Sequence, residues 1–128
     1  MKFSTKAEYG LKAIVNLAGV FPMQKNLKSI AKEEGISLKY LEQMIANLRR
    51  HGLVTSSKGK SGGYTLSKNP KNIRVSEIIE VLEGSIAPMK CFDKICALKK
   101  KCPSSIVWDK VGIQIKKTLY DIKLSELI

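Results

Sequence analysis

The sequence is poor in the residues on which most enzyme sites and secreted folds depend. Its 128 residues include one histidine, one tryptophan, four prolines and three cysteines. One histidine offers little acid–base chemistry, and neither a Ser-His-Asp constellation nor a phosphate-binding glycine loop stands out. No apolar run reaches the roughly 18 residues that a membrane span needs, and the first ten residues are too polar for a secretion signal. We therefore expect a cytoplasmic chain that is not an enzyme and has no membrane partner.

Positive charge is abundant and unevenly distributed. Lysine and arginine total 23 against 11 acidic residues, which gives a net charge of +12. Residues 1–75 hold 14 basic and 4 acidic side chains, a net +10, whereas residues 76–128 hold 9 and 7, a net +2. A basic surface attracts nucleic acid, and it also attracts anionic membranes and acidic proteins or merely keeps a chain soluble. The asymmetry indicates that a polyanion would contact residues 1–75.

Apolar spacing and capping residues predict three helices before residue 52. The first runs from about Thr5 to Val20, the second covers residues 27–34 and is closed by Gly35, and the third follows a cap at Ser37. A helix, a glycine turn and a longer polar helix are typical of a helix-turn-helix. The same pattern occurs in helical hairpins that bind no nucleic acid.

Two short strand-like runs follow the third helix, at residues 53–57 and 64–67. They are joined by a glycine-rich loop that carries Lys58 and Lys60, which predicts a β-hairpin with a basic tip. Such a hairpin after a recognition-type helix is the wing of a winged helix, although an ordinary exposed turn has the same composition. We therefore expect a mainly α-helical fold with a small β-hairpin wing, in which residues 1–75 form a winged helix-turn-helix domain that binds double-stranded DNA.

Polar residues at the start of the third helix have the chemistry of DNA contacts. Gln43 can form two hydrogen bonds with adenine, Glu42 can accept from cytosine, and Ser37 and Lys39 can hold phosphate. Tyr40 suits packing against the domain as well as it suits DNA. His51 at the end of this helix suits the helix dipole or a phosphate better than a metal.

Residues 76–128 are expected to hold a short helix capped by Ser76 and a longer helix from Pro103 to about Tyr120. The longer helix carries a stripe of apolar residues four apart, from Val107 to Leu119. Such a stripe is most often core. Because the winged unit is already complete, pairing with a second copy is the better use of the stripe. We expect a homodimer in which residues 76–128 form a cysteine loop and dimerisation helices, in one compact unit with residues 1–75.

The three cysteines, Cys91, Cys96 and Cys102, are close together in the sequence. Three thiols cannot all pair within one chain, and a reducing compartment disfavours lasting disulfides. Thiolates favour zinc, copper(I) and iron–sulphur clusters, and five lysines against one aspartate between residues 90 and 101 favour the ionised thiol. From these residues a metal or cluster site is the favoured interpretation. A thiol redox switch and incidental buried cysteines stay open.

Three stretches of the chain are more specific than any single helix pattern: MKFSTKAEYGLKAIVNLA, ISLKYLEQMIANLRRHGLV and KGKSGGYTLSK. They resemble the Rrf-type bacterial winged-helix regulators, which include IscR, NsrR and CymR. The resemblance implies a homodimeric cytoplasmic regulator whose two recognition helices enter successive major grooves of a pseudo-palindromic operator. It places Ser37, Lys39, Tyr40, Glu42 and Gln43 against the operator, with Lys58, Lys60, Gly62 and Gly63 in the wing.

The same resemblance bears on the cysteines, because cluster-binding members carry three in the loop before the final long helix. It implies a [2Fe-2S] or [4Fe-4S] cluster on Cys91, Cys96 and Cys102, although four residues lie between the first two here where five is common. IscR-like members add a histidine where this chain has Ser105. NsrR-like members use an acidic residue of the partner subunit near the amino terminus, and Glu8 stands at the matching position.

The favoured hypothesis is a sequence-specific transcriptional regulator, with repression as its expected action, whose operator affinity an iron–sulphur cluster controls. Resemblance to CymR keeps open the same regulator without a cluster, with thiol redox or a partner protein as its signal. A small redox or metal-carrier protein is a further alternative, but it gives the wing no role.

Overall fold

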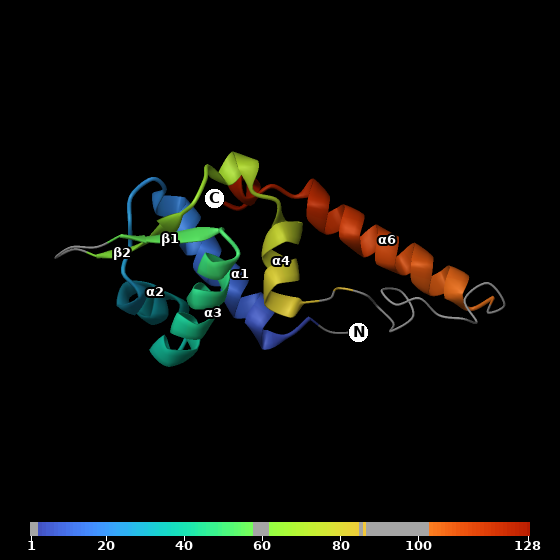
Figure 1. Cartoon of the computed structure of the whole chain (residues 1–128), viewed down its shortest axis with the longest axis horizontal. Coiled ribbons are helices and arrows are strands. Elements are labelled where there is room, and N and C mark those ends of the chain that lie inside the picture. Colours follow the sequence, from blue (N-terminus) through green and yellow to red (C-terminus); the bar gives the residue numbers. More distant parts are fainter. Residues whose placement is uncertain (1–2, 58–61, 85, 87–102) are drawn as a thin grey trace.

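The computed structural model describes residues 3–57, 62–84, 86 and 103–128, and most of them are helical (Figure 1). The elements in chain order are α1 (Thr5–Val20), α2 (Leu27–Glu34), α3 (Leu38–Arg50), β1 (Val54–Ser57), β2 (Gly63–Leu66), the 3₁₀ helix η1 (Pro70–Asn72), α4 (Val75–Glu83), α6 (Ser105–Asp121) and the 3₁₀ helix η3 (Leu124–Leu127). The expected mainly helical fold with one antiparallel hairpin is confirmed. Within the described ranges, no helix has the length and apolarity needed to cross a membrane.

Local capping sets the ends of the first three helices. The side chains of Ser4, Asn26 and Ser37 accept hydrogen bonds from backbone N–H groups in the first turns of α1, α2 and α3. Gly35, at φ +67°, ends α2 in the left-handed conformation that glycine adopts without steric cost. The predicted bounds of α1 and α2 are therefore confirmed, because they depended only on neighbouring residues.

The start of α4 differs from the prediction. Ser76 is not the cap: it lies inside the helix and is only 8% exposed, and Arg74 is the first flanking residue. The backbone N–H of Val75 donates to the carbonyl of Ile122, and the carboxylate of Glu77 accepts from the N–H of Arg74. The carboxyl-terminal segment thus sets where α4 begins, and no signal near Ser76 reveals this long-range contact.

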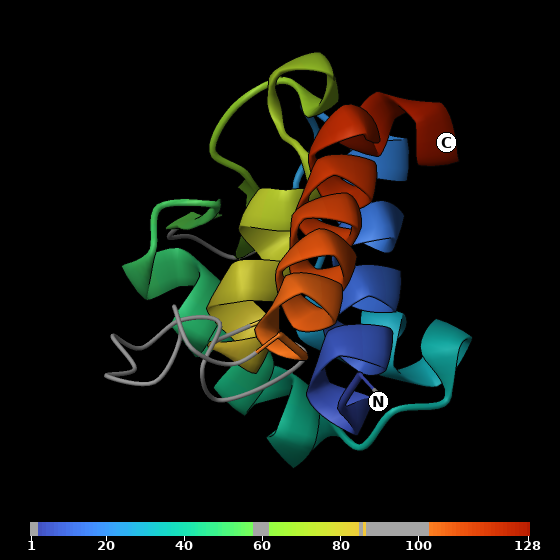
Figure 2. The ribbon, with the colours of Figure 1, turned by 90° about the vertical axis from the view of Figure 1, so that its right-hand side faces the viewer.

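One hydrophobic core joins the two parts of the chain. Helix α1 lies in its middle, with α2, α3 and α4 around it (Figures 1 and 2). Gly10 allows α4 to come close, since a Cβ atom there would lie 2.4 Å from Leu82 Cδ1. Leu124 near the carboxyl terminus is fully buried in the same core. The largest fully buried side chains are Ile14, Leu17, Ile30, Leu41, Ile45, Leu48, Val54, Ile73, Ile78 and Leu124.

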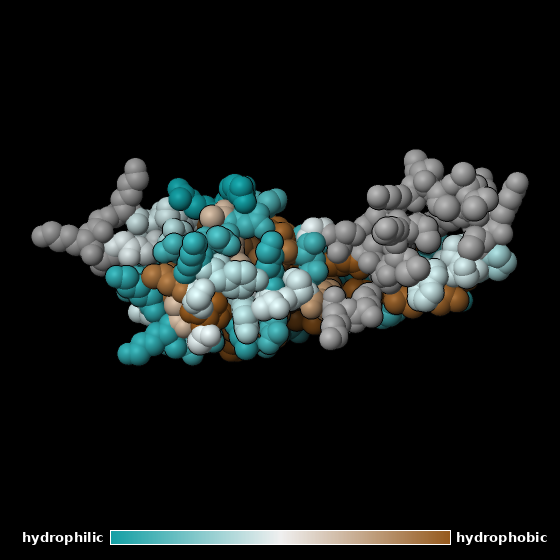
Figure 3. Space-filling view, turned by 90° about the horizontal axis from the view of Figure 1, so that it is seen from below, coloured by the Kyte–Doolittle hydropathy of each residue, from teal (hydrophilic) through white to brown (hydrophobic). Residues whose placement is uncertain are grey.

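Helix α6 extends away from this core, and only its carboxyl-terminal part lies over α4 (Figures 1 and 2). Its projecting part carries apolar side chains that are exposed to solvent in the single chain (Figure 3). Ile113 is 61% exposed and Val107, in the predicted stripe, is 52% exposed. The stripe is therefore exposed at Val107 and Val111, whereas Leu119 at its other end packs against the core. An exposed apolar surface of this kind is typical of an interaction site.

The hairpin is fixed to the connection between α1 and α2. Strands β1 and β2 pair in the register Val54↔Leu66 to Ser57↔Gly63. On the other side of β2, Lys25 and Tyr64 exchange two backbone hydrogen bonds of 2.9 Å each. Gly63 lies in the strand rather than at the tip, and a Cβ atom there would lie 2.7 Å from the carbonyl oxygen of Lys25. The close approach of these two backbones thus depends on glycine at this position.

Replacing Gly63 by alanine tests this contact. We expect Gly63→Ala to lower the free energy of unfolding by about 1–3 kcal/mol, because neither backbone can move without breaking the Lys25–Tyr64 pair. Gly19→Ala on α1 is the control: a Cβ atom there would meet nothing within 4 Å, so the substitution should raise stability by about 0.5–1 kcal/mol. Urea unfolding followed by circular dichroism measures both. Equal stability of Gly63→Ala and the native chain would contradict the close approach.

Candidate nucleic-acid interface

Helix α3 has two chemically different faces. Its inner face is buried in the core through Leu41, Met44, Ile45 and Leu48. Its outer face is exposed at Lys39, Glu42, Gln43, Ala46 and Arg49, and all of these except Ala46 are polar. This division follows from the helical repeat, which returns each side chain to the same face every three or four positions. One side of the helix is therefore held rigidly while the other is free to meet a partner.

The predicted DNA-contacting residues of α3 lie at its amino-terminal end. Lys39, Glu42 and Gln43 are exposed on the outer face, and Ser37 is the cap, whose Oγ accepts from the N–H of Tyr40 at 3.1 Å. Tyr40 is half-buried, and its ring packs edge-on against Tyr9 with 6.3 Å between centroids. Tyr40 therefore has a packing role, and the contact of all five residues with DNA stays a prediction.

A groove of about 550 Å³ joins α3 to the wing. Its walls come from the start of α2, the first turns of α3 and both strands of the hairpin, and they include Lys28, Glu42, Ser57 and Gly62. The structure thus brings Glu42 of the predicted recognition helix together with Gly62 and the buried Gly63 of the predicted wing. Lys58 and Lys60 lie outside the described residues.

A polar network that sequence reasoning missed fixes the base of the wing. Lys25 Nζ donates to Asn16 Oδ1 at 2.7 Å and to Glu33 Oε2 at 2.5 Å, and Asn16 Nδ2 donates to Glu33 Oε2 at 2.8 Å. The hydrogen bonds from Lys25 and then from Asn16 lower the pKa of Glu33 below its ordinary value. The three residues come from α1, α2 and the loop between them, so no local pattern identifies the network.

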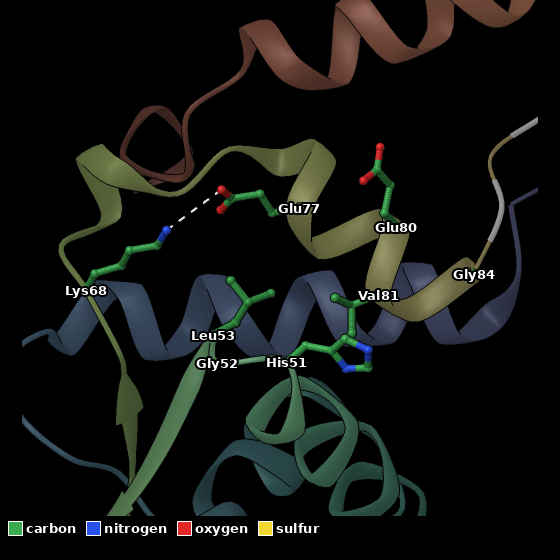
Figure 4. A pocket seen from close by; sticks show the side chains of 8 residues that line it. All are labelled: His51, Gly52, Leu53, Lys68, Glu77, Glu80, Val81 and Gly84. Carbon is green, nitrogen blue, oxygen red and sulfur yellow. Dashed lines mark ion pairs between the residues drawn. The ribbon is translucent and has the colours of Figure 1, made fainter.

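His51 ends α3, as expected from its position. Its Nδ1 lies 2.9 Å from the carbonyl oxygen of Asn47, at the edge of a cleft between α3 and α4. Figure 4 shows the imidazole beside Val81, with the ion pair of Lys68 and Glu77 farther along the same cleft. Among the described residues, no group of three histidine, cysteine or acidic side chains is placed to hold a metal ion. These contacts are those of a helix-terminating residue.

The predicted cluster ligands are only partly within the described residues. Cys91, Cys96 and Cys102 lie outside them. Glu8 is exposed on α1, where it forms an ion pair of 3.8 Å with Lys12. One turn earlier, the N–H of Ser4 donates to Glu83 Oε1 at 2.5 Å, in the last turn of α4. Helix α1 therefore begins beside the point from which the chain continues toward the cysteines.

Glu8 also borders an apolar groove of about 370 Å³. The groove lies between α1, α4 and the carboxyl-terminal ends of α6 and η3. Its walls are mainly apolar side chains: Phe3, Ala7, Leu11, Val75, Ile79, Leu119, Ile122 and Leu127. This groove and the exposed side chains of α6 are two apolar surfaces that the other described residues leave uncovered.

Comparison with known proteins agrees with this architecture. The Rrf2 family model, described as an iron-dependent transcriptional regulator, matches residues 3–128. The chain belongs to the Rrf2 family. It is therefore a regulator of the helix-turn-helix type, and the resemblance stated from the sequence is confirmed. The relatives are named as transcriptional regulators, in agreement with the expectation that the chain is not an enzyme.

Both IscR and CymR proteins are among the relatives of this Rrf2 protein. The structure of T. potens IscR is 41% identical, with a TM-score of 0.79 over 99% of this chain and 85% of that one. The structure of CymR, described as the global cysteine regulator of B. subtilis, is 36% identical, with a TM-score of 0.81 over 99% and 95%. IscR of Escherichia coli is 34% identical over 100% of this chain and 80% of its own.

The lowered pKa of Glu33 makes the polar network of Lys25, Asn16 and Glu33, at the base of the wing, sensitive to acid. Its stabilising effect is present above the pKa that glutamate has in the unfolded chain, and is lost as the pH falls through the lowered pKa of the folded state. We therefore expect Glu33→Gln to be less stable than the native chain at neutral pH, with the difference shrinking in acid. Urea unfolding at a series of pH values measures it. Glu80→Gln is the control, because it removes an exposed carboxylate without a described ion pair. A stability difference between Glu33→Gln and the native chain that does not change with pH would contradict the stabilising role of the ionised Glu33.

Proposed function

We propose that this Rrf2 protein is a cytoplasmic, homodimeric repressor that binds a pseudo-palindromic DNA operator, and that an iron–sulphur cluster on its cysteines controls operator affinity. The observation that carries the proposal is the polar outer face of α3 beside the wing, in the part of the chain with a net charge of +10. A recognition helix held by its apolar face and flanked by a basic hairpin is suited to the major groove of DNA.

The roles of the individual side chains follow from their positions. Glu42 and Gln43 project from the exposed face and are suited to base edges, while Lys39 and the hydroxyl hydrogen of Ser37 are suited to phosphate oxygens. Lys28 at the start of α2 borders the groove between α3 and the wing, where it adds positive charge beside Glu42. Phosphate contacts fix the register of the helix, and base contacts select the sequence.

A second copy of the chain is the partner that best suits the two uncovered apolar surfaces. The exposed side chains of α6 and the groove beside Glu8 lie on the same chain, so two copies can cover both surfaces reciprocally. A dimer would also supply the two recognition helices that a pseudo-palindromic site requires.

The available donor atoms suit an iron–sulphur cluster. Cys91, Cys96 and Cys102 would supply three thiolates, the ligands that such clusters prefer, and the partner subunit's Glu8 would supply a carboxylate. Glu8 is exposed, and its one described ion pair, with Lys12, is long. When bound, a [2Fe-2S] or [4Fe-4S] cluster would join the three thiols and restrain the segment that connects α4 to α6.

The last turn of α4 provides a path from that segment to the recognition helix. Asn47 Nδ2 of α3 donates to the carbonyl oxygen of Val81 at 3.1 Å, and Leu82 lies against Gly10 of α1. A displacement of this turn would therefore change the placement of α3. Such a change alters operator affinity only if the two states of the dimer bind DNA differently.

The likeness to CymR supports a second candidate signal. CymR of Bacillus subtilis is 38% identical over 99% of this chain and 89% of its own. This identity lies between those of the two IscR proteins, 34% and 41%, so identity does not separate IscR from CymR. A Staphylococcus aureus CymR, 32% identical with a TM-score of 0.78, has been solved in an oxidized form. In this variant of the proposal, the signal is either the thiol redox state of the same cysteines or the binding of a partner protein. Membership of the Rrf2 family gives no support to a small redox or metal carrier.

Substitution of Gln43 tests the DNA-reading face. We expect Gln43→Ala to weaken binding to an operator duplex selected from a random pool by about 5–150-fold, since a bidentate base contact contributes about 1–3 kcal/mol. Binding to random DNA should change little. Gln24→Ala is the control, because this exposed glutamine lies in the loop before α2. Fluorescence anisotropy measures the affinities of the native protein and of both variants. If Gln43→Ala kept the native preference for the operator over random DNA, Gln43 would not be a base-reading residue.

Anaerobic purification tests the cluster. We expect iron, sulphide and visible absorption in the native protein, loss of that absorption in Cys102→Ala, and an altered spectrum in Glu8→Ala. Ser105→Ala serves as a control because Ser105 is not an assigned ligand. Operator affinity should differ between the cluster-loaded and cluster-free protein, and equal affinities would remove the sensing role. An iron-free protein whose affinity changes on thiol oxidation would favour the CymR-like signal instead.

A further inference from the structure

A small basic pocket lies where α1, α3 and α4 meet. Its volume is about 230 Å³, and it is distinct from the groove that joins α3 to the wing. Lys6 contributes from the first turn of α1, Leu82 from the last turn of α4, and Tyr40, Gln43 and Arg50 from α3. The pocket therefore lies along the α1 side of the recognition helix and extends toward its carboxyl-terminal end.

Its charge is uniformly positive among the described residues. Lys6 and Arg50 are both exposed, and no acidic side chain lines the pocket. Neither cation takes part in a described ion pair, whereas Lys12, Lys25 and Lys68 each contact a glutamate. The amides of Gln43 and Asn47 and the hydroxyl of Tyr40 add hydrogen-bond donors. This chemistry is complementary to an oxyanion.

The guanidinium of Arg50 is oriented from within the protein. Its Nη2 donates to Asn47 Oδ1 at 3.4 Å, while the Nδ2 of the same amide donates to the carbonyl oxygen of Val81. Asn47 thus connects Arg50 to the last turn of α4. The pocket is therefore part of the contact between α3 and α4, the contact through which the proposed signal passes.

We propose that Lys6 and Arg50 together bind one backbone phosphate of the operator strand on the α1 side of α3. The inference rests on the proposed function, because it requires α3 to lie in the major groove. A DNA phosphate is favoured over a free anion because Gln43 lines the pocket and also stands on the outer face of α3, so the pocket adjoins the DNA-reading surface. The site would fix the register of α3 from the flank opposite to the wing.

The salt dependence of operator binding tests the site. In the double variant Lys6→Gln/Arg50→Gln, we expect the slope of log K against log salt concentration to become shallower by about 1.8, because each subunit of the dimer loses one phosphate contact and each contact contributes about 0.9. The ratio of affinities for the operator and for a mismatched duplex should stay the same, since a phosphate contact carries no sequence information. Circular dichroism confirms that the variant is folded.

A charge-matched control separates the site from the loss of net charge. Lys71→Gln/Lys117→Gln removes the same two charges from exposed positions on η1 and α6, so its slope should equal that of the native protein. Equal slopes for the two double variants would overturn the inference while leaving DNA binding intact. Absence of operator binding by the native protein would instead contradict the proposed function.

A titration without DNA distinguishes a duplex phosphate from a free anion. We expect inorganic phosphate at millimolar concentration to cause no saturable change in the NMR signals of Lys6 and Arg50. Saturable binding that the double variant lacks would assign the pocket to a small anionic ligand and would overturn its assignment to DNA.

Discussion

The arrangement of this Rrf2 protein depends on the burial of one face of α3 against α1 and α4. Four apolar side chains of α3 lie in the core, and they fix both the rotation of the helix about its own axis and its distance from the core. Because the helical repeat then leaves the polar face outside, no further interaction is needed to present that face to DNA. The hairpin is held separately, through the Lys25–Tyr64 pair and the Lys25–Glu33 contact, beside the same face.

Helix α4, which leads to the proposed sensing segment, shares one core with the helices of the DNA-reading part. Helix α4 and the segment around Leu124 complete the core that α1, α2 and α3 begin. Leu82 against Gly10 and Val81 against Asn47 bring the last turn of α4 into contact with both helices that hold the reading surface. A displacement of this turn would therefore shift α1 and α3 and so change the affinity for DNA. The same holds whether the displacement is caused by a cluster, by thiol oxidation or by a bound protein.

Local features of the sequence predicted the local features of the fold. The bounds of α1 and α2, the cap at Ser37 and the position of the hairpin follow from apolar spacing and from residues within one turn. The features of the structure that the sequence predicted wrongly or did not reveal depend on contacts between residues that are distant in the sequence. The segment around Ile122 sets the start of α4, and the carbonyl of Lys25 gives Gly63 its role in the strand. The pocket of Lys6 and Arg50 joins residues 44 positions apart, and no periodicity in the sequence connects them.

The proposed regulator combines an outward-facing recognition helix with a dimer made through the uncovered apolar surfaces. The architecture of the preferred DNA site tests both parts at once. Selection from a pool of random duplexes should enrich an inverted repeat whose half-site centres are separated by a whole number of helical turns. Enrichment of a single unpaired half-site, or of no sequence at all, would contradict it.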